Sequence, residues 1–198
     1  MIDHKQLESF GNTLVGEFHF DNLHKTIYAT DASVYRKIPL AVAYPKSVAD
    51  IQQLIAFATE NNTTLIPRTA GTSLAGQCVG DGIIVDVSKH FTEIISFDLE
   101  HKTVTLQPGV IRDELNLFLK PHGVFFGPNT STSNRCMMGG MVGNNSSGST
   151  SIRYGVTRDK VVSVDTILSD GSLATFSEIT SKEFLQKLEE DTLEGKIY

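Results

Sequence analysis

Residues 127–148 read GPNTSTSNRCMMGGMVGNNSSG, a run of 22 residues in which Arg135 is the one charged side chain. A connection this long is uncommon inside a compact domain unless it is functional or disordered. Four apolar residues that would be out of place in a solvated linker stand beside three glycines: Met137, Met138, Met141 and Val142 beside Gly139, Gly140 and Gly143. Glycines let the backbone approach a ligand closely, and residues 143–146 add amide and hydroxyl donors. We infer that this segment binds a large ligand with apolar and polar parts, such as a dinucleotide with an aromatic ring; a disordered linker is the alternative.

A second polar loop, residues 67–77, follows a predicted strand and reads PRTAGTSLAGQ. Its small residues allow backbone N–H groups to converge on an anion. It is not a Walker A loop, because no Lys-Ser/Thr pair follows Gly76, and the spacing of Gly71 and Gly76 does not fit the GxGxxG of a Rossmann fold. Ser73 stands in GxSxxG, one residue longer than a nucleophile elbow, so a serine nucleophile is not expected.

Both loops lie in windows that contain no carboxylate. Residues 115–158 carry four basic side chains and residues 61–80 carry only Arg68. The 198 residues have a net charge of −6, so windows of +4 and +1 leave −11 on the remainder. Acid-free, glycine-rich segments tolerate a bound anion such as phosphate, although chance and ordinary polar loops would give the same pattern. The acidic total argues against a general nucleic-acid or membrane-surface binder.

Periodicity along the chain predicts an α+β domain and not a regular βαβ array. Residues 1–34 are weakly patterned and predict a short helix followed by a linker. Strands are expected over residues 40–44, 64–66, 83–87, 94–99, 103–107, 161–168 and 173–176. Helices are expected over residues 48–60, capped by Ser47 with Asp50 three residues later, and over 111–122 and 182–190.

Cysteine and histidine usage indicates the compartment and argues against a metal site. Cys78 and Cys136 are 58 positions apart, and the six histidines show no metal-ligand spacing. The N-terminus has no signal-peptide pattern, and no apolar run reaches the ~20 residues of a membrane span. A reducing cytoplasm is the expected location.

Six ordered motifs resemble the flavin-binding domain of the FAD-linked oxidase family, the p-cresol methylhydroxylase / vanillyl-alcohol oxidase type. They are PRTAGTS (67–73), QPGV (107–110), PHG (121–123), MGGMVGNN (138–145), YGVTRD (154–159) and LSDG (168–171). Within the family, the text is most similar to the glycolate oxidase flavoprotein subunit and to D-2-hydroxyacid dehydrogenases acting on D-lactate or D-2-hydroxyglutarate. The run STSNR (131–135) resembles members that are fused to an iron–sulfur module.

The resemblance implies a two-subdomain FAD-binding fold with mixed sheets flanked by helices. It implies an N-terminal segment (1–34), an FAD-binding domain (35–178) with subdomains of about 35–108 and 109–178, and a truncated C-terminal continuation (179–198). The chain is therefore expected to be a fragment that lacks the substrate domain.

The resemblance also implies the residues that hold FAD. From the first loop, the pyrophosphate would be bound by Arg68, Thr69, Ala70, Gly71, Thr72, Ser73, Leu74, Gly76 and Gln77. From the second, the ribityl chain and pyrophosphate would be lined by Gly139, Gly140, Gly143, Asn144, Asn145 and Ser146. Pro128 and Ser131 would lie near the flavin, Val161 or Val162 near the adenine, and Tyr154 would shape the wall or simply pack. Arg135 and Arg153 would neutralise phosphate or pair at the surface.

FAD is expected to be non-covalent. Some members attach it through a His in the first loop or a Cys before the double Gly. No His lies between Lys25 and Lys89, and Cys136 stands where D-2-hydroxyacid members have an ordinary Cys.

The implied reaction is oxidation of a D-2-hydroxy acid (D-lactate, glycolate or D-2-hydroxyglutarate) to the 2-oxo acid. Electrons would pass to a separate acceptor or to an iron–sulfur cluster in a partner or in an absent C-terminal region. No catalytic residue is assigned, because the family draws these groups mainly from the substrate domain. The alternatives are the FAD domain of a related reductase or molybdenum hydroxylase, a non-catalytic flavin-binding module, and an interaction protein without cofactor.

Overall fold

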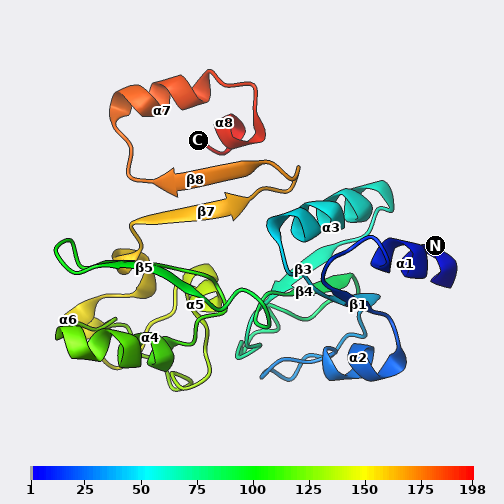
Figure 1. The fold of residues 1–198 in the computed structure, drawn as a ribbon, viewed down its shortest axis with the longest axis horizontal. Helices are drawn as coiled ribbons and strands as arrows, with labels where there is room; N and C mark the ends of the chain where they lie inside the picture. Colours follow the sequence, from blue (N-terminus) through cyan, green and yellow to red (C-terminus); the bar gives the residue numbers. More distant parts are fainter. Residues whose placement is uncertain (1) are drawn as a thin grey trace.

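The N-terminal half of the chain is built on a four-stranded sheet in the order β1-β2-β4-β3 (Figure 1). The computed structural model describes residues 2–198. The strands are β1 (Glu17–His19), β2 (Ala41–Tyr44), β3 (Leu65–Arg68) and β4 (Ile83–Asp86). β1 runs antiparallel to β2, whereas β2, β4 and β3 are parallel to one another.

Helices cover both faces of this sheet. α1 (His4–Gly11) and α3 (Val48–Glu60) lie on one side and α2 (Asn22–Ile27) on the other (Figure 1). The core against α1 and α3 is formed by Leu7, Ala41, Ala43, Leu54, Phe57, Ile83 and Val85. The predicted strands and the helix capped by Ser47 are confirmed here.

The short helix predicted within residues 1–34 is confirmed as α1, but the predicted linker after it is wrong, because β1 and α2 follow. The carboxylate of Asp50, which is fully buried, accepts hydrogen bonds from the backbone of Val15 (2.9 Å), Gly16 (3.0 Å) and Lys46 (2.8 Å). These bonds hold the chain before β1 against α3. No local pattern in residues 1–34 reveals them.

A second core lies beyond the sheet. The hairpin of β5 (Ile94–Asp98) and β6 (Thr103–Leu106) packs with α4 (Arg112–Leu119), the 3₁₀ turn η1 (Lys120–His122) and α5 (Met138–Gly143). Its buried members are Val110, Leu115, Leu119, Cys136, Met138 and Met141. The hairpin thus packs with residues after 109, although the sequence prediction places it in the first subdomain; the subdomain limits remain a prediction.

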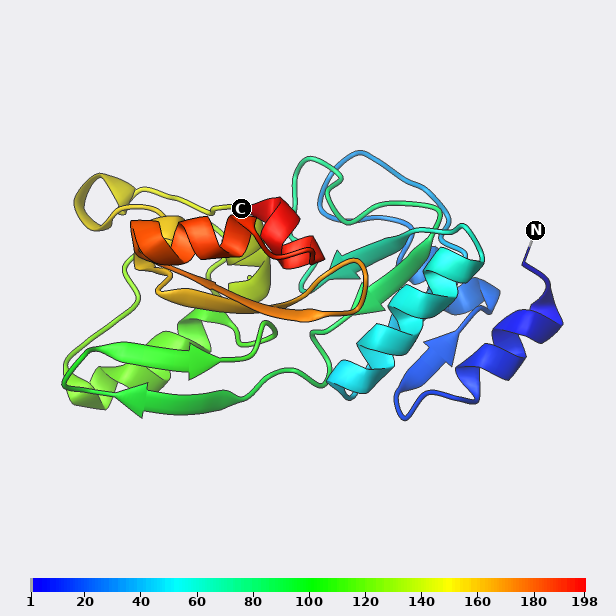
Figure 2. The same ribbon diagram turned by 90° about the horizontal axis from the view of Figure 1, so that it is seen from above.

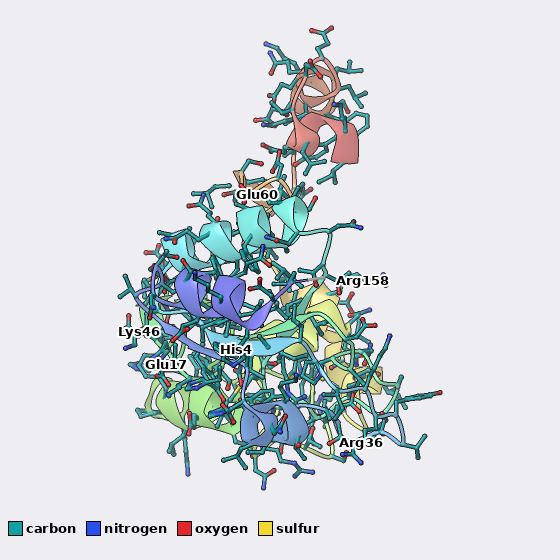
Figure 3. The ribbon with its side chains drawn as sticks, turned by 90° about the vertical axis from the view of Figure 1, so that its right-hand side faces the viewer. His4, Glu17, Arg36, Lys46, Glu60 and Arg158 are labelled. Atoms are coloured by element: carbon teal, nitrogen blue, oxygen red, sulfur yellow. The ribbon has the colours of Figure 1, made fainter. Side chains whose placement is uncertain are left out.

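The C-terminal part begins with α6 (Ser151–Tyr154) and η2 (Thr157–Lys160). The hairpin of β7 (Ser163–Ile167) and β8 (Leu173–Ser177) follows, with α7 (Ser181–Leu188) beside it (Figure 2). α7 and the unpredicted α8 (Leu193–Ile197) project from the body of the molecule beyond α3 (Figure 3). Nε2 of Gln52 in α3 donates to the carbonyl of Gly171 at 2.8 Å and ties this hairpin to the first core.

The elements together confirm the predicted α+β class, with one mixed sheet and two antiparallel hairpins. No helix within residues 2–198 combines the length and apolar character that crossing a membrane requires.

Candidate functional site

The two polar loops, far apart in the sequence, meet in the structure. A Cβ added at Gly140 in α5 would lie 2.8 Å from Oγ1 of Thr69, so only a glycine allows this approach without a shift. Nε2 of Gln77 donates to Oδ1 of Asn144 at 2.9 Å. The first loop and the end of α5 therefore form one continuous polar surface.

The first loop leaves β3 at Arg68 and is shaped by two glycines and a serine. Gly71 and Gly76 have φ values of 65° and 71°, in the region that side chains disfavour. Oγ of Ser73 accepts from the backbone of Ala75 (3.2 Å) and Gln77 (3.3 Å) and donates to Oε1 of Gln77 (2.6 Å). Ser73 is thus a turn-forming residue.

Five consecutive backbone N–H groups of this loop lack a partner. Within residues 2–198, no hydrogen bond engages the backbone N–H of any residue from Ala70 to Leu74. Backbone donors need an acceptor, and a run of N–H groups in a glycine-containing turn is a typical anion-binding concavity. Water or a bound anion must satisfy them.

Arg68 connects the start of the first loop to residues 28–30. Its Nη1 donates to the carbonyl of Thr30 at 2.8 Å, and its guanidinium lies 4.9 Å from the ring centre of Tyr28. The Tyr28 hydroxyl donates in turn to buried Asp86 at 2.5 Å. Burial, followed by this bond to Asp86, raises the pKa of Tyr28 above its ordinary value of 10.0. The structure thus gives Arg68 a positioning contact, which the sequence prediction of pyrophosphate binding did not include.

The second loop contains a short helix, α5, in a segment where the sequence predicts no helix. Met138 and Met141 are buried in the second core, which accounts for the apolar residues among the glycines. The backbone N–H of Gly139 donates to the carbonyl of Pro108 at 2.8 Å, and a Cβ at Gly139 would lie 2.5 Å from Cβ of Pro108. Gly143 differs: a Cβ there would meet no atom within 4 Å.

The segment after α5 is held by its own side chains and by η2. Nδ2 of Asn144 donates to Oγ of Ser146 at 3.1 Å. Asn145 adopts φ 46°, and its Oδ1 accepts from the backbone of Arg158 at 3.0 Å. Buried Thr157, which the sequence reasoning missed, donates its hydroxyl to the carbonyl of Ser146 at 2.7 Å.

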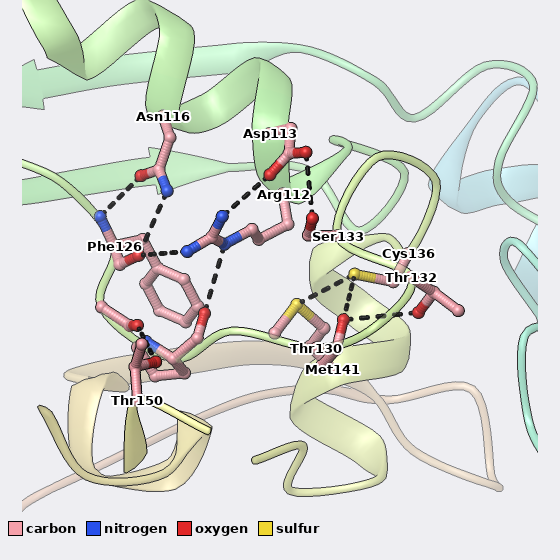
Figure 4. A network of polar contacts seen from close by, with 12 residues as sticks. Arg112, Asp113, Asn116, Phe126, Thr130, Thr132, Ser133, Cys136, Met141 and Thr150 are labelled. Atoms are coloured by element: carbon pink, nitrogen blue, oxygen red, sulfur yellow. Dashed lines mark hydrogen bonds and ion pairs between the residues drawn. The ribbon is translucent and has the colours of Figure 1, made fainter. Parts of the chain in front are cut away.

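A polar network fixes the start of the second loop (Figure 4). Nε of Arg112 donates to the carbonyl of Pro128 (3.2 Å), its Nη2 donates to the carbonyl of Phe126 (3.2 Å), and its Nη1 pairs with Asp113 (2.8 Å). Asn116 exchanges two hydrogen bonds with the backbone of Phe126. Arg112 and Asn116 lie one helical turn apart on α4, but nothing in their local sequence points to these carbonyls.

Four other predicted residues make no hydrogen bond or ring contact with the first loop or α5 within residues 2–198, although Ser131 belongs to the second loop and Tyr154 packs against Gly127 at its start. Tyr154 packs edge-on against Phe125 at 5.2 Å; Ser131 and Val162 are exposed, and the backbone of Val161 bonds to Arg158. Arg135 and Arg153 make only local contacts, with Asn134 and with the ring of Tyr154. Their roles toward FAD remain predictions.

Both cysteines are free and buried. Sγ of Cys136 lies 3.2 Å from Oγ1 of Thr130 and 3.5 Å from Sδ of Met141 (Figure 4). Sγ of Cys78 lies 3.6 Å from Asp31, and burial raises the pKa of the Cys78 thiol. Both therefore have the environment of packing residues.

Comparison with known proteins agrees with this geometry. A family model described as "FAD binding domain" matches residues 39–177. The chain belongs to this FAD-binding domain family. It is 38% identical over 180 residues to D-2-hydroxyglutarate dehydrogenase of Haemophilus influenzae, covering 86% of this chain and 18% of that protein. It is 33% identical over 162 residues to glycolate oxidase subunit GlcD of Bacillus subtilis, covering 80% of this chain and 34% of that protein.

Solved structures show the same fold at lower sequence identity. BBE-like 1 of Physcomitrella patens matches with a TM-score of 0.73 and 20% identity, over 89% of this chain and 39% of that one. Xylooligosaccharide oxidase of Myceliophthora thermophila matches with a TM-score of 0.72 and 24% identity, over 91% and 38%. The predicted fold and family resemblance are confirmed. The chain spans about a sixth to a third of the length of the curated relatives named above.

Proposed function

We propose that this chain binds FAD without a covalent bond, at the surface where the first loop meets α5. The observation that carries the proposal is the run of five unpartnered N–H groups from Ala70 to Leu74. These donors suit the two phosphates of a dinucleotide, and no carboxylate in residues 61–80 opposes an anion there. The remaining first-loop residues, Thr69, Gly76 and Gln77, would keep this turn in shape.

The α5 side of the surface fits a flat ligand in contact with backbone. Gly140 and Gly143 are exposed, and the space at Gly143 is open. Asn144 and Ser146 present polar groups next to them. Met138 and Met141 face the core, so the apolar contacts of the flavin ring must come from elsewhere. We keep Ser131 and Tyr154 as proposed flavin neighbours and Val161 or Val162 as proposed adenine neighbours. The side chain of Pro128 is fully buried, so Pro128 would shape the site from beneath and not touch the ring.

The burial of Cys136 supports a non-covalent cofactor. Its sulfur is enclosed between Thr130 and Met141, and the first loop contains no histidine. Two free thiols also support a reducing location, and we propose the cytoplasm.

We further propose that the natural protein oxidises a D-2-hydroxy acid to the 2-oxo acid. The support is the similarity to proteins named D-2-hydroxyglutarate dehydrogenase and glycolate oxidase subunit. When bound, FAD supplies the acceptor for the hydride that leaves the substrate C–H. In this proposal, the residues described above bind and orient the cofactor. The electrons then pass from FAD to a separate acceptor, such as an iron–sulfur partner.

The visible absorbance spectrum tests the first proposal. The untagged chain is reconstituted with FAD, and unbound FAD is removed before the spectrum is recorded. We expect flavin bands that leave the protein on acid precipitation. A chain that stays colourless after reconstitution would contradict FAD binding, and bands that stay with the precipitate would contradict the non-covalent assignment. For the second proposal, the full natural protein is assayed with D-lactate, glycolate and D-2-hydroxyglutarate and a dye acceptor; inactivity with all three would overturn it.

A further inference from the structure

A cluster of imidazoles and carboxylates lies at the edge of the sheet, before the part of the chain that matches the FAD-binding family. His19 ends β1, Asp21 caps α2, and His24 stands in the first turn of α2. One ligand atom from each of these three residues lies within 4.8 Å of the other two. The sequence predicts no metal site here, because the six histidines show no metal-ligand spacing.

The two imidazole rings are stacked face to face. Their centres are 3.8 Å apart and their planes differ by 7°. Each ring is also tied to a carboxylate: Nδ1 of His24 lies 2.7 Å from Oδ2 of Asp21, and Nε2 of His19 lies 3.4 Å from Oε2 of Glu17. For His19, the carboxylate of Glu17 on one ring nitrogen orients the ring and raises its basicity as a ligand through the other nitrogen, whereas Asp21 is itself a candidate ligand.

The charges around the cluster favour a cation. Glu17 and Asp21 contribute two negative charges, and Lys89, which bonds to Glu17 at 2.7 and 2.9 Å, offsets one of them. Oδ1 of Asp21 accepts from the backbone of Leu23 and His24, so an ion would bind Oδ2 in place of its present contact with Nδ1 of His24. Lys89 and His19 occupy Glu17, which therefore serves as a second-sphere acceptor.

The packing also shows an unused histidine nitrogen beside Glu17. Nε2 of His90 is buried without a hydrogen-bond partner within residues 2–198, and it lies 3.6 Å from Oε1 of Glu17. This is too far for a hydrogen bond, so the Glu17 carboxylate is bonded to Lys89 and His19 and not to His90.

We propose that His19, Asp21 and His24 bind one divalent transition-metal ion of the Zn²⁺ class. Two imidazole nitrogens and a carboxylate oxygen suit Zn²⁺ and its neighbours in the first transition row, whereas Mg²⁺ and Ca²⁺ prefer oxygen alone. Bond lengths of about 2.0–2.1 Å place tetrahedral ligand atoms about 3.3 Å apart, so atoms now within 4.8 Å of one another need to close by up to about 1.5 Å. The two stacked rings also need to turn out of parallel so that their in-plane lone pairs meet at one ion. Both histidines are at least a quarter exposed, which leaves them free to do so.

The chain provides a matched control for this site. Nδ1 of His101 lies 2.8 Å from Oδ2 of Asp98, three residues away, as in the pair of His24 and Asp21. No second imidazole stacks on His101, although His19 stacks on His24. Residues 98–101 thus contain a His–Asp pair without a second imidazole. Among the described residues, the complete cluster of two histidines and an aspartate is found at residues 19–24.

Calorimetric titration of the chelator-treated, untagged chain with Zn²⁺ alone tests the proposal. We expect one saturable equivalent in the wild type and in His101→Ala, and binding weaker by at least about tenfold in His24→Ala and His19→Ala. Far-UV circular dichroism checks folding; His24 lies on a short exposed helix, so His24→Ala keeps the test decisive if His19→Ala misfolds. Absence of saturable binding, or wild-type affinity in the folded His24→Ala protein, would overturn the proposal.

Discussion

Nε2 of Gln77 donates to Oδ1 of Asn144 at 2.9 Å and joins two loops that are 67 residues apart in the sequence. On one side, Gln77 is held by Ser73; on the other, Asn144 is bonded to Ser146. The two sides of the proposed FAD site are therefore positioned by the chain's own hydrogen bonds. A site organised before its ligand arrives loses less conformational entropy on binding, and this raises the affinity.

Removing this bond should weaken FAD binding with little effect on folding. A hydrogen bond contributes about 0.5–1.5 kcal/mol, so Gln77→Ala and Asn144→Ala should each lower FAD affinity by about 3- to 10-fold. The double variant should lose less than the sum of the two, because both remove the same bond. Flavin fluorescence titration measures these affinities.

Gln52→Ala is the control, since Gln52 also makes a long-range amide-to-carbonyl bond, to Gly171 in the β7–β8 hairpin. It should keep wild-type FAD affinity. Equal weakening in Gln52→Ala would mean that general loosening, and not the contact between the loops, sets the affinity.

Two glycines of α5 should respond oppositely to substitution by alanine. At Gly139 the new Cβ would lie 2.5 Å from Cβ and 3.1 Å from Cα of Pro108, and we expect a loss of about 1–3 kcal/mol in the free energy of unfolding. At Gly143 it would meet nothing, and replacing a helical glycine should raise stability by up to about 1 kcal/mol. Urea denaturation measures both.

The Gly143→Ala variant also reports on the site, because its extra methyl group would occupy the surface where FAD is proposed to lie. We expect weaker FAD binding in this stable protein. Unchanged affinity would place the cofactor away from Gly143.

The elements that were predicted correctly are those whose signals are local. Alternation identifies the β5–β6 and β7–β8 hairpins, and the cap at Ser47 with helical periodicity identifies α3. α5 was not predicted as a helix, because three of its six residues are glycines and its stability comes from burying Met138 and Met141.

Long-range polar contacts could not be predicted at all. Asp50 looks like a capping residue, yet its carboxylate holds the backbone before β1. Arg112 looks like an ordinary surface charge, yet it bonds to carbonyls 14 and 16 residues away. Each partner is a backbone group that every residue possesses, so residue identity does not reveal the pairing. In the proposed site, the sequence indicates two candidate loops but not the bonds that join them.

Arg112 should be among the residues most sensitive to substitution in the second core. Its side chain is 13% exposed, and Arg112→Ala would leave the carbonyls of Phe126 and Pro128 without these donors. We expect a loss of about 2–3 kcal/mol in the free energy of unfolding. Arg112→Lys should recover only part of it, because an ammonium group cannot span both carbonyls as the guanidinium does. Full recovery by lysine in urea denaturation would show that charge alone matters.

Tyr28 should make the stability of the protein depend on alkaline pH. Its hydroxyl must stay protonated to donate to buried Asp86, and burial with that bond raises the pKa of Tyr28 above 10.0. Because the pKa is raised in the folded state, the stabilisation is fully present below about pH 10 and declines above it, where the unfolded chain releases the proton. Tyr28→Phe removes the hydroxyl and should cost about 2 kcal/mol at neutral pH.

The difference in unfolding free energy between wild type and Tyr28→Phe should therefore shrink as the pH rises above about 10. Subtraction of the two curves cancels the titration of the lysines and of the other tyrosines, which both proteins share. Urea denaturation at a series of pH values measures it. A constant difference across this range would mean that Tyr28 has the same pKa in the folded and unfolded states, and would contradict the prediction.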